Sequence, residues 1–313
     1  MKYENCKRSI EIDDYNREFA NMGFSEVIVM AKHNLQWDEN KLKRFLREGR
    51  GQGEGENYKP WVTVQDFPSK GRCSRVLGWK TNRIHHLFTD SETRYFYLLE
   101  WENAVVDIRE HFPLLDLEEV IKEKDDLNFN LFKDKNSGLP YIIYTSFLIT
   151  IKDTDGQKRY IARSLKADYE LQRKRSIERL EIERRYWLNK HIDWGIVTQK
   201  DIPTIKAKNV EWVHSSLHFT DERGLEKEEM IYLCDVLLEK MTESSQTIGK
   251  ITADFDKEYK LQTGTGLFIF KHLIATKRIK LNMNKEIKLN ERLENLVIDI
   301  KKERMGEDSI VNY

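Results

Sequence analysis

The segment YIIYTSFLITIKDTDGQKRYIARSLKA, residues 141–167, decides the fold. It contains two apolar runs that meet at Asp155 and Gly156, and such a dipeptide between hydrophobic runs is a strong signal for a β-hairpin. The first run is apolar at nearly every position from Ile142 to Ile151, which is typical of a strand covered on both faces. The segment therefore predicts a hairpin inside a sheet that packs against helices on two sides.

Elements on either side of this hairpin extend the pattern. The chain reads, in order, as strands at 74–80 and 83–88, a helix from Asp90, a strand at 105–115, the hairpin, a helix from Asp168 to about Lys190, and a strand at 193–198. Strands and helices in this order predict a mixed α/β sheet with helices packed on it.

The C-terminal third has a different character. Apolar residues recur at helical spacing in three successive runs from Met230 to Thr276, and residues 277–289 then alternate around a turn. Three short helices followed by a hairpin is the plan of a winged helix domain. We therefore expect an N-terminal extension at 1–35, a mixed α/β domain at 36–207, a winged-helix-like domain at 208–300 and a tail at 301–313.

Composition narrows the functional classes. Lysine plus arginine equals aspartate plus glutamate at 53 each, so a nucleic-acid partner must be met by a local patch and not by a global charge. The three cysteines lie far apart without metal-ligand spacing, which excludes a disulfide framework and a zinc site. No signal peptide or long uncharged apolar run is present. We expect a cytoplasmic protein without a membrane partner.

The second arm of the hairpin carries a candidate catalytic pattern. Side chains alternate along a strand, so Ser164 and Lys166 project on one face with the carbonyl of Leu165 between them. Nucleases that hydrolyse phosphodiesters with magnesium need carboxylates for the cation and a lysine for the attacking water. A solvated lysine at the end of a strand is the alternative explanation.

Four further segments resemble the TnsA family, the endonuclease subunit of heteromeric transposases. They are EGRGQGEGENYKPWVTVQDFPSKGR at 48–72, RIHHLFTDSETRYFYLLEWE at 83–102, VVDIREHFPLL at 105–115 and LEIERRYW at 180–187. The resemblance runs from about Phe45 to about Trp212. It implies a restriction-endonuclease-like domain and a winged-helix-like domain that docks on the ATPase TnsC.

The resemblance also implies the site residues. The helix glutamate of the family falls on Glu92 and its hairpin lysine on Lys166, so Glu92 and the carbonyl of Leu165 are expected to hold Mg²⁺, which Mn²⁺ can replace. Ser164 stands where the family has a polar ligand such as glutamine. Ser146 stands at the position of the family aspartate.

The serine at 146 raises the question of activity, because a neutral hydroxyl does not supply the charge of a carboxylate. Glu183 is the candidate substitute acid, and its alternative role is that of a solvated glutamate on a charged helix. The function implied by the resemblance is cutting of the non-transferred (5′) strand at transposon ends beside the transposase TnsB. The alternatives are an inactive assembly subunit of the same complex and a stand-alone nuclease.

Candidate DNA contacts surround the glycine-rich loop at 49–55. They are Arg50, Lys59, Arg72, Arg75 and His86. Lysine and arginine in such a patch can follow a phosphate backbone, and a solvated loop is the alternative. The hairpin at 277–289 is also basic, and it is expected to contact either DNA or TnsC.

Overall fold

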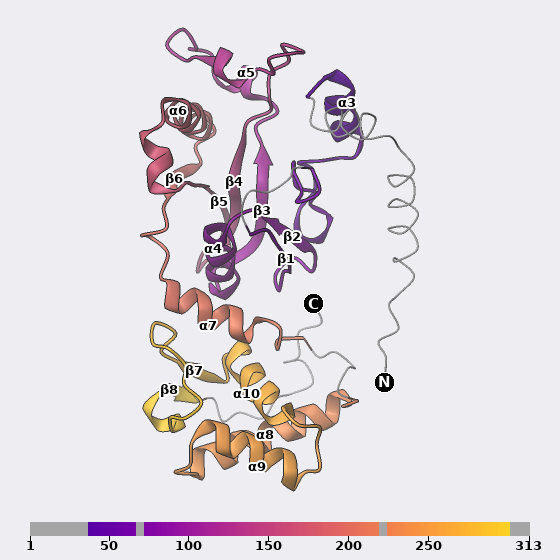
Figure 1. Ribbon diagram of the computed structural model, residues 1–313, viewed down its shortest axis with the longest axis vertical. Helices are drawn as coiled ribbons and strands as arrows, with labels where there is room; N and C mark the ends of the chain where they lie inside the picture. The colour runs from indigo at the N-terminus through magenta and orange to yellow at the C-terminus, as the bar shows by residue number, and fades with distance from the viewer. Residues whose placement is uncertain (1–36, 67–71, 219–223, 301–313) are drawn as a thin grey trace, which may run out of the picture.

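The computed structural model describes residues 37–66, 72–218 and 224–300, and the predicted extension and tail lie outside these ranges (Figure 1). The first part of the chain forms α3 (Glu39–Arg47), η1 (Gly55–Asn57), β1 (Ser74–Leu77), β2 (Ile84–Leu87), α4 (Asp90–Trp101), β3 (Val105–Pro113), α5 (Leu117–Val120), η2 (Phe129–Phe132), β4 (Tyr144–Lys152), β5 (Lys158–Leu165), η3 (Asp168–Gln172), α6 (Lys174–Asn189) and β6 (Asp193–Val197). The second part forms α7 (Thr204–His214), α8 (Lys227–Glu243), α9 (Ile248–Glu258), α10 (Thr265–Ala275), β7 (Ile279–Leu281), η5 (Leu293–Asn295) and β8 (Val297–Ile300).

The predicted hairpin forms the centre of a four-stranded sheet in the order β3-β4-β5-β6. The β3–β4 and β4–β5 pairs are antiparallel, whereas β6 runs parallel to β5. On β4, Phe147 and Ile149 pack in the core cluster that includes α4, and Leu148 packs in the cluster that includes α6. The prediction of a mixed sheet with helices on both faces is confirmed.

The alternation of side chains breaks at one place in β4. Thr145 and Phe147 have the same parity, but Thr145 bonds Glu183 of α6 while the Phe147 ring packs against Tyr95 of α4. On the neighbouring strand β3, Phe112 pairs with Thr145 and Glu110 pairs with Phe147. His111 lies between these two partners and has a φ of 50°. This irregularity brings the residues around Ser146 out of the regular pleat, at the end of the strand where the site lies.

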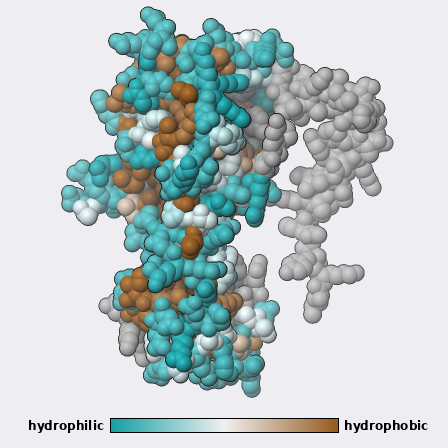
Figure 2. Space-filling model, turned by 60° about the vertical axis from the view of Figure 1, so that its left-hand side comes forward, coloured by the Kyte–Doolittle hydropathy of each residue, from teal (hydrophilic) through white to brown (hydrophobic). Residues whose placement is uncertain are grey.

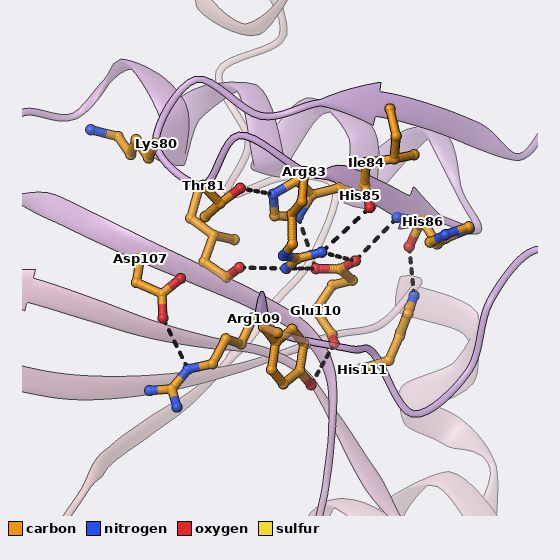
Figure 3. Close-up of polar contacts among 12 residues, drawn as sticks. Lys80, Thr81, Arg83, Ile84, His85, His86, Asp107, Arg109, Glu110 and His111 are labelled. Atoms are coloured by element: carbon orange, nitrogen blue, oxygen red, sulfur yellow. Dashed lines mark hydrogen bonds and ion pairs between the residues drawn. The ribbon is translucent and has the colours of Figure 1, made fainter. Parts of the chain in front are cut away.

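A buried polar network joins β2 to β3 (Figure 3). The carboxylate of Glu110, fully buried on β3, accepts hydrogen bonds from the Arg83 guanidinium at 2.8 and 2.5 Å. Nδ1 of His85 lies 2.8 Å from the same carboxylate, and Thr81 Oγ1 lies 2.7 Å from the other ring nitrogen. Burial alone would raise the pKa of Glu110, but His85 and Arg83 hold that pKa well below its usual range.

We expect Glu110→Ala to lower the free energy of unfolding by about 3–5 kcal/mol, because Arg83 would be left buried without its partner. The depressed pKa means that the stabilisation is present at neutral pH and is lost as the pH falls through the folded-state pKa. Urea unfolding at several pH values measures both effects. Glu102→Ala is the control, because Glu102 is about half exposed and its ion pair with Lys206 is worth at most about 1 kcal/mol. Equal losses for the two variants would contradict the role of the network.

The C-terminal part is joined to the sheet part through α7. This helix packs against α4 on one side and α10 on the other, and the predicted boundary between 207 and 208 falls inside it. The indole of Trp79 stacks on the ring of His214 at 4.4 Å and donates to its carbonyl. One core cluster accordingly runs from the sheet into helices α8 to α10.

The C-terminal helices are followed by a two-stranded sheet, in which β7 pairs with β8. Asn209 of α7 donates to the carbonyls of Met283 and Lys285 and so fixes the segment after β7 against α7. Figure 2 shows that hydrophilic residues cover most of one face of the molecule, with apolar patches over both its upper and its lower half. Among the described residues, no helix combines the length and the apolar character that crossing a membrane requires.

Candidate active site

Lys166 follows the last residue of β5 and lines the wall of a cavity of about 400 Å³. Its backbone N–H donates to the carbonyl of Val197 at the end of β6, which fixes the start of its side chain. Burial lowers the pKa of Lys166, and the nearby Arg179 guanidinium acts in the same direction. The carboxylates of Glu183, Glu170 and Glu92 oppose this shift, so the ammonium shares an electrostatic environment with all three. A fully solvated lysine is not what the structure shows.

Glu92 lies in the first turn of α4 with its side chain buried. Its Oε2 atom accepts a 2.6 Å hydrogen bond from the N–H of Phe88, and the N-cap of the helix is Thr89. Glu92 does not line the cavity, but its charge acts on Lys166 and on Tyr144, which both do. The helix glutamate and the hairpin lysine therefore interact electrostatically.

Ser146 is buried and its hydroxyl oxygen accepts a 2.9 Å hydrogen bond from the N–H of Leu165. The serine thus bonds the backbone of the residue before Lys166. An aspartate at this position would be able to accept the same bond. Ser146 therefore holds the two hairpin arms together next to Lys166.

Glu183 is 1% exposed, so the alternative of a solvated glutamate is wrong. Its Oε2 accepts hydrogen bonds from the hydroxyls of Ser164 and Thr145, and its Oε1 accepts one from Arg179 Nε at 3.2 Å. Arg179 also donates to the carbonyl of Tyr144 at 2.6 Å. Three donors already occupy the Glu183 carboxylate, and a metal ion would have to displace them before this residue served as the substitute acid.

The residues present fit a weakly held magnesium ion rather than a tightly held one. Mg²⁺ prefers oxygen ligands that include one or two carboxylates, completed by water and substrate phosphates. Here Glu92 supplies one carboxylate and Ser146 a neutral hydroxyl that already accepts a hydrogen bond. Within 37–66, 72–218 and 224–300, no three His, Cys, Asp or Glu side chains gather to hold a metal.

The predicted DNA contacts divide into two groups. Arg50 is only 13% exposed at its side chain: it forms ion pairs with Asp66 and Glu48 and covers the ring of Phe45 at 3.6 Å. These contacts stabilise the loop that follows α3 and occupy the Arg50 guanidinium, which disfavours the predicted DNA contact at this residue. Sequence reasoning missed this because Asp66 is 16 residues away and its approach depends on the loop.

The other four predicted contacts lie nearer to solvent. Lys59, Arg72 and Arg75 are exposed, and Lys59 donates to the carbonyl of Glu48. Arg75 lies opposite His86 in the β1–β2 ladder. The ring of His86 is half-buried and accepts from the N–H of Val64, and burial lowers its pKa. Neutral His86 is therefore a weaker phosphate contact than the two arginines.

The structure adds residues to the site that the sequence did not indicate. The cavity that contains Lys166 is also lined by Lys41, Arg173, Arg175, Arg179, Tyr141 and Trp37. Residues 173–175 form a short basic run, Arg-Lys-Arg, and this run is the sequence signal that could have indicated the arginines of the cavity. Such runs are usually solvated, and only the tertiary fold, which brings residues 166–179 and α3 to one cavity, makes this run part of it.

Comparison with known proteins assigns the chain to a family. A model described as "TnsA-like endonuclease N terminal" matches residues 102–199, and one described as "TnsA endonuclease C terminal" matches residues 201–283. The chain is 37% identical over 263 residues to the transposon Tn7 transposition protein TnsA of Escherichia coli, covering 84% of this chain and 93% of that protein. The chain belongs to the TnsA endonuclease family. The resemblance seen in the sequence is confirmed, and the range of the first TnsA match contains Ser146, Ser164, Lys166 and Glu183.

We expect Lys166→Met to raise the free energy of unfolding at pH 7, because burial penalises the ammonium in the folded state. The lowered pKa means that this penalty is present at neutral pH and is relieved as the pH rises from the folded-state pKa toward the ordinary lysine pKa of 10.5, so the gain should be smaller at pH 10.5 than at pH 7. Urea unfolding at the two pH values measures it. Lys174→Met, at an exposed lysine of α6, should stay within about 0.5 kcal/mol of the wild type. A loss of stability in Lys166→Met would show that the ammonium is well compensated.

Proposed function

We propose that this TnsA family member is the endonuclease subunit of a heteromeric DNA transposase and that it hydrolyses the non-transferred (5′) strand at the transposon ends. The observation that carries the proposal is the position of Lys166. It lies at the end of the central hairpin, inside the range matched by the TnsA family, in a cavity that also presents Arg179. A phosphodiester in this cavity would meet two cations and the influence of Glu92.

Each residue has a role that follows from its surroundings. Lys166 orients the attacking water or neutralises charge on the phosphate, and burial strengthens either interaction because fewer waters screen it. Arg179 stabilises the negative charge that develops on the phosphate oxygens, and its own position is fixed by Glu183 and Tyr144. Ser164 and Ser146 act indirectly, since their hydroxyls bond Glu183 and the Leu165 N–H. They are positioning residues.

Magnesium, with manganese as a substitute, is the cation that we expect the reaction to require. The donor set supports weak binding by Glu92 and the Leu165 carbonyl, with the phosphate of the substrate supplying further ligands. When bound, such an ion supplies charge stabilisation at the phosphate. We expect cleavage to reach its maximal rate only at a high concentration of this cation.

We also propose a type for each domain and partners for the protein. The mixed sheet flanked by α4 and α6 supports a restriction-endonuclease-like catalytic domain, and the order α8, α9, α10, β7, β8 supports a winged-helix-like domain. The partners that we propose are a TnsB-type transposase, which cuts and joins the other strand, and a TnsC-type ATPase, which docks on the C-terminal domain. Lys285 and Lys288 are exposed beyond β7 and provide the alternative contact with DNA.

A strand-specific cleavage assay tests the function. The protein is incubated with the partner transposase and end-labelled transposon-end DNA in magnesium, and each strand is analysed separately. We expect a cut in the non-transferred strand only when this protein is present, and Lys166→Met should reduce it by at least about 100-fold. Assembly of the complex with the non-transferred strand intact would contradict the proposal.

We expect Ser146→Asp to increase magnesium-dependent cutting by at least about tenfold and to lower the magnesium concentration that gives half the maximal rate, because it adds a carboxylate beside the Leu165 N–H. Ser146→Asn is the matched control, since it has nearly the same shape and can accept the same hydrogen bond without the charge. Rates are measured against magnesium concentration. Vigorous cutting by the wild type that neither variant changes would show that position 146 is not a metal-ligand position.

A further inference from the structure

The cavity beside Lys166 has walls of two kinds. Its volume of about 400 Å³ is near the lower end of the range for small-molecule sites. It lies between α3, the segment 141–144 before β4, and the segment 166–179 that leads from β5 into α6. These segments are far apart in the sequence, so the cavity is a product of the tertiary fold.

Positive charge dominates one wall. Five cationic side chains line the cavity together with a single carboxylate, Glu170; they are Lys41, Lys166, Arg173, Arg175 and Arg179. The guanidinium of Arg175 lies 5.6 Å from the ring centre of Phe132, and that of Arg173 lies 5.0 Å from the ring centre of Tyr169. An anion, and a phosphate in particular, is the group that this wall fits.

Aromatic rings form the other wall. Tyr141 is 38% exposed and its ring lies 6.2 Å from that of Trp37, at an angle of 31°. The Tyr141 hydroxyl donates to Asp134 at 2.7 Å and its backbone N–H donates to the carbonyl of Phe132 at 2.7 Å. Trp37 is fixed by a hydrogen bond from its indole to the carbonyl of Pro140. The Tyr141 ring is therefore held at both ends and leaves one part open to a ligand.

We propose that this cavity is a subsite for one unpaired nucleotide of the strand to be cut, with the base on the ring of Tyr141 and the phosphate at Arg173, Arg175 and Lys166. The inference rests on the proposed function and adds to it the conformation of the substrate. A DNA duplex keeps its bases paired and stacked, and its backbone is usually followed by cations on an open surface. A cavity of this size with an aromatic wall fits a single base, because any base can stack on an aromatic ring.

The inference predicts that DNA with an unpaired nucleotide binds more tightly than a perfect duplex. The full chain is titrated into two labelled duplexes of the same sequence, one perfect and one with a single-nucleotide bulge of 2-aminopurine, and binding is followed by fluorescence anisotropy. We expect the bulged DNA to bind about tenfold more tightly, the order of one base stacked on an aromatic side chain. The 2-aminopurine emission should fall on binding as the base stacks.

Two pairs of variants separate stacking from general charge attraction. Tyr141→Ala should abolish the preference for the bulge and the change in emission, whereas Tyr141→Phe should keep both. Arg175→Ala should weaken the binding of the bulged DNA by at least about fivefold, as loss of a charged phosphate contact does. Lys174→Ala should change it by less than about twofold, because Lys174 is an exposed neighbour outside the cavity.

The subsite is refuted if the wild type binds neither DNA or binds both equally, if Tyr141→Ala keeps the preference, or if Lys174→Ala costs as much as Arg175→Ala. The strand-cleavage assay distinguishes this failure from failure of the proposed function. Cutting without any preference for the bulge would remove the subsite and leave the endonuclease in place. A preference that depends on Tyr141, without cutting, would support the subsite and contradict the endonuclease.

Discussion

The buried carboxylate of Glu183 is the constraint on which the arrangement of the site depends. A buried charge is costly unless it is paired and hydrogen-bonded, and Glu183 achieves this with Arg179 of its own helix and with hydroxyls from β4 and β5. Helix α6 is therefore held at one position along the two strands. Because Arg179 also bonds the backbone of Tyr144, the same interaction closes one wall of the cavity.

The lowered pKa of Lys166 depends on that packing. The end of β5 is held by β6 through the bond from Lys166 N–H to Val197 and by Ser146 through the bond from Leu165 N–H. With α6 in place, the ammonium is removed from bulk water and faces Arg179, so its pKa falls. Such tuning is common at catalytic sites and also occurs in structural ion-pair networks. The TnsA family match covers this hairpin and supports the proposal that the tuned lysine takes part in nuclease chemistry.

The sequence was sufficient for the parts of the fold that depend on local patterns. The hairpin at 141–167 follows from apolar runs around an Asp-Gly turn, and the position of Lys166 at its end follows from the length of the second arm. Strand alternation also predicted that Ser164 and Lys166 share one face, and in the structure Ser164 bonds Glu183 of α6 while Arg179 of α6 lies near Lys166. The family could be identified from several short sequence blocks in the right order, because recognising such blocks does not require knowledge of long-range contacts.

Sequence patterns did not predict the contacts between distant segments. Glu183 lies in a charged run that favours exposure, and only the two hydroxyls and Arg179 make its burial possible. Arg50 was expected to contact DNA, but Asp66 occupies its guanidinium. Tyr141 and Arg175 come together with α3 only in the folded chain, and so no sequence pattern predicts that they line one cavity.

The central claim is that Glu92 and Lys166 act on one phosphate in one site, and a double-mutant cycle on the cleavage rate tests it most directly. The rates of Glu92→Gln, Lys166→Met and the double variant are compared in the presence of the partner transposase. Residues that act as a unit are strongly non-additive. The account predicts that the double variant is no slower than the slower single variant. Losses that add in full, as they do for distant and independent sites, would contradict a shared site.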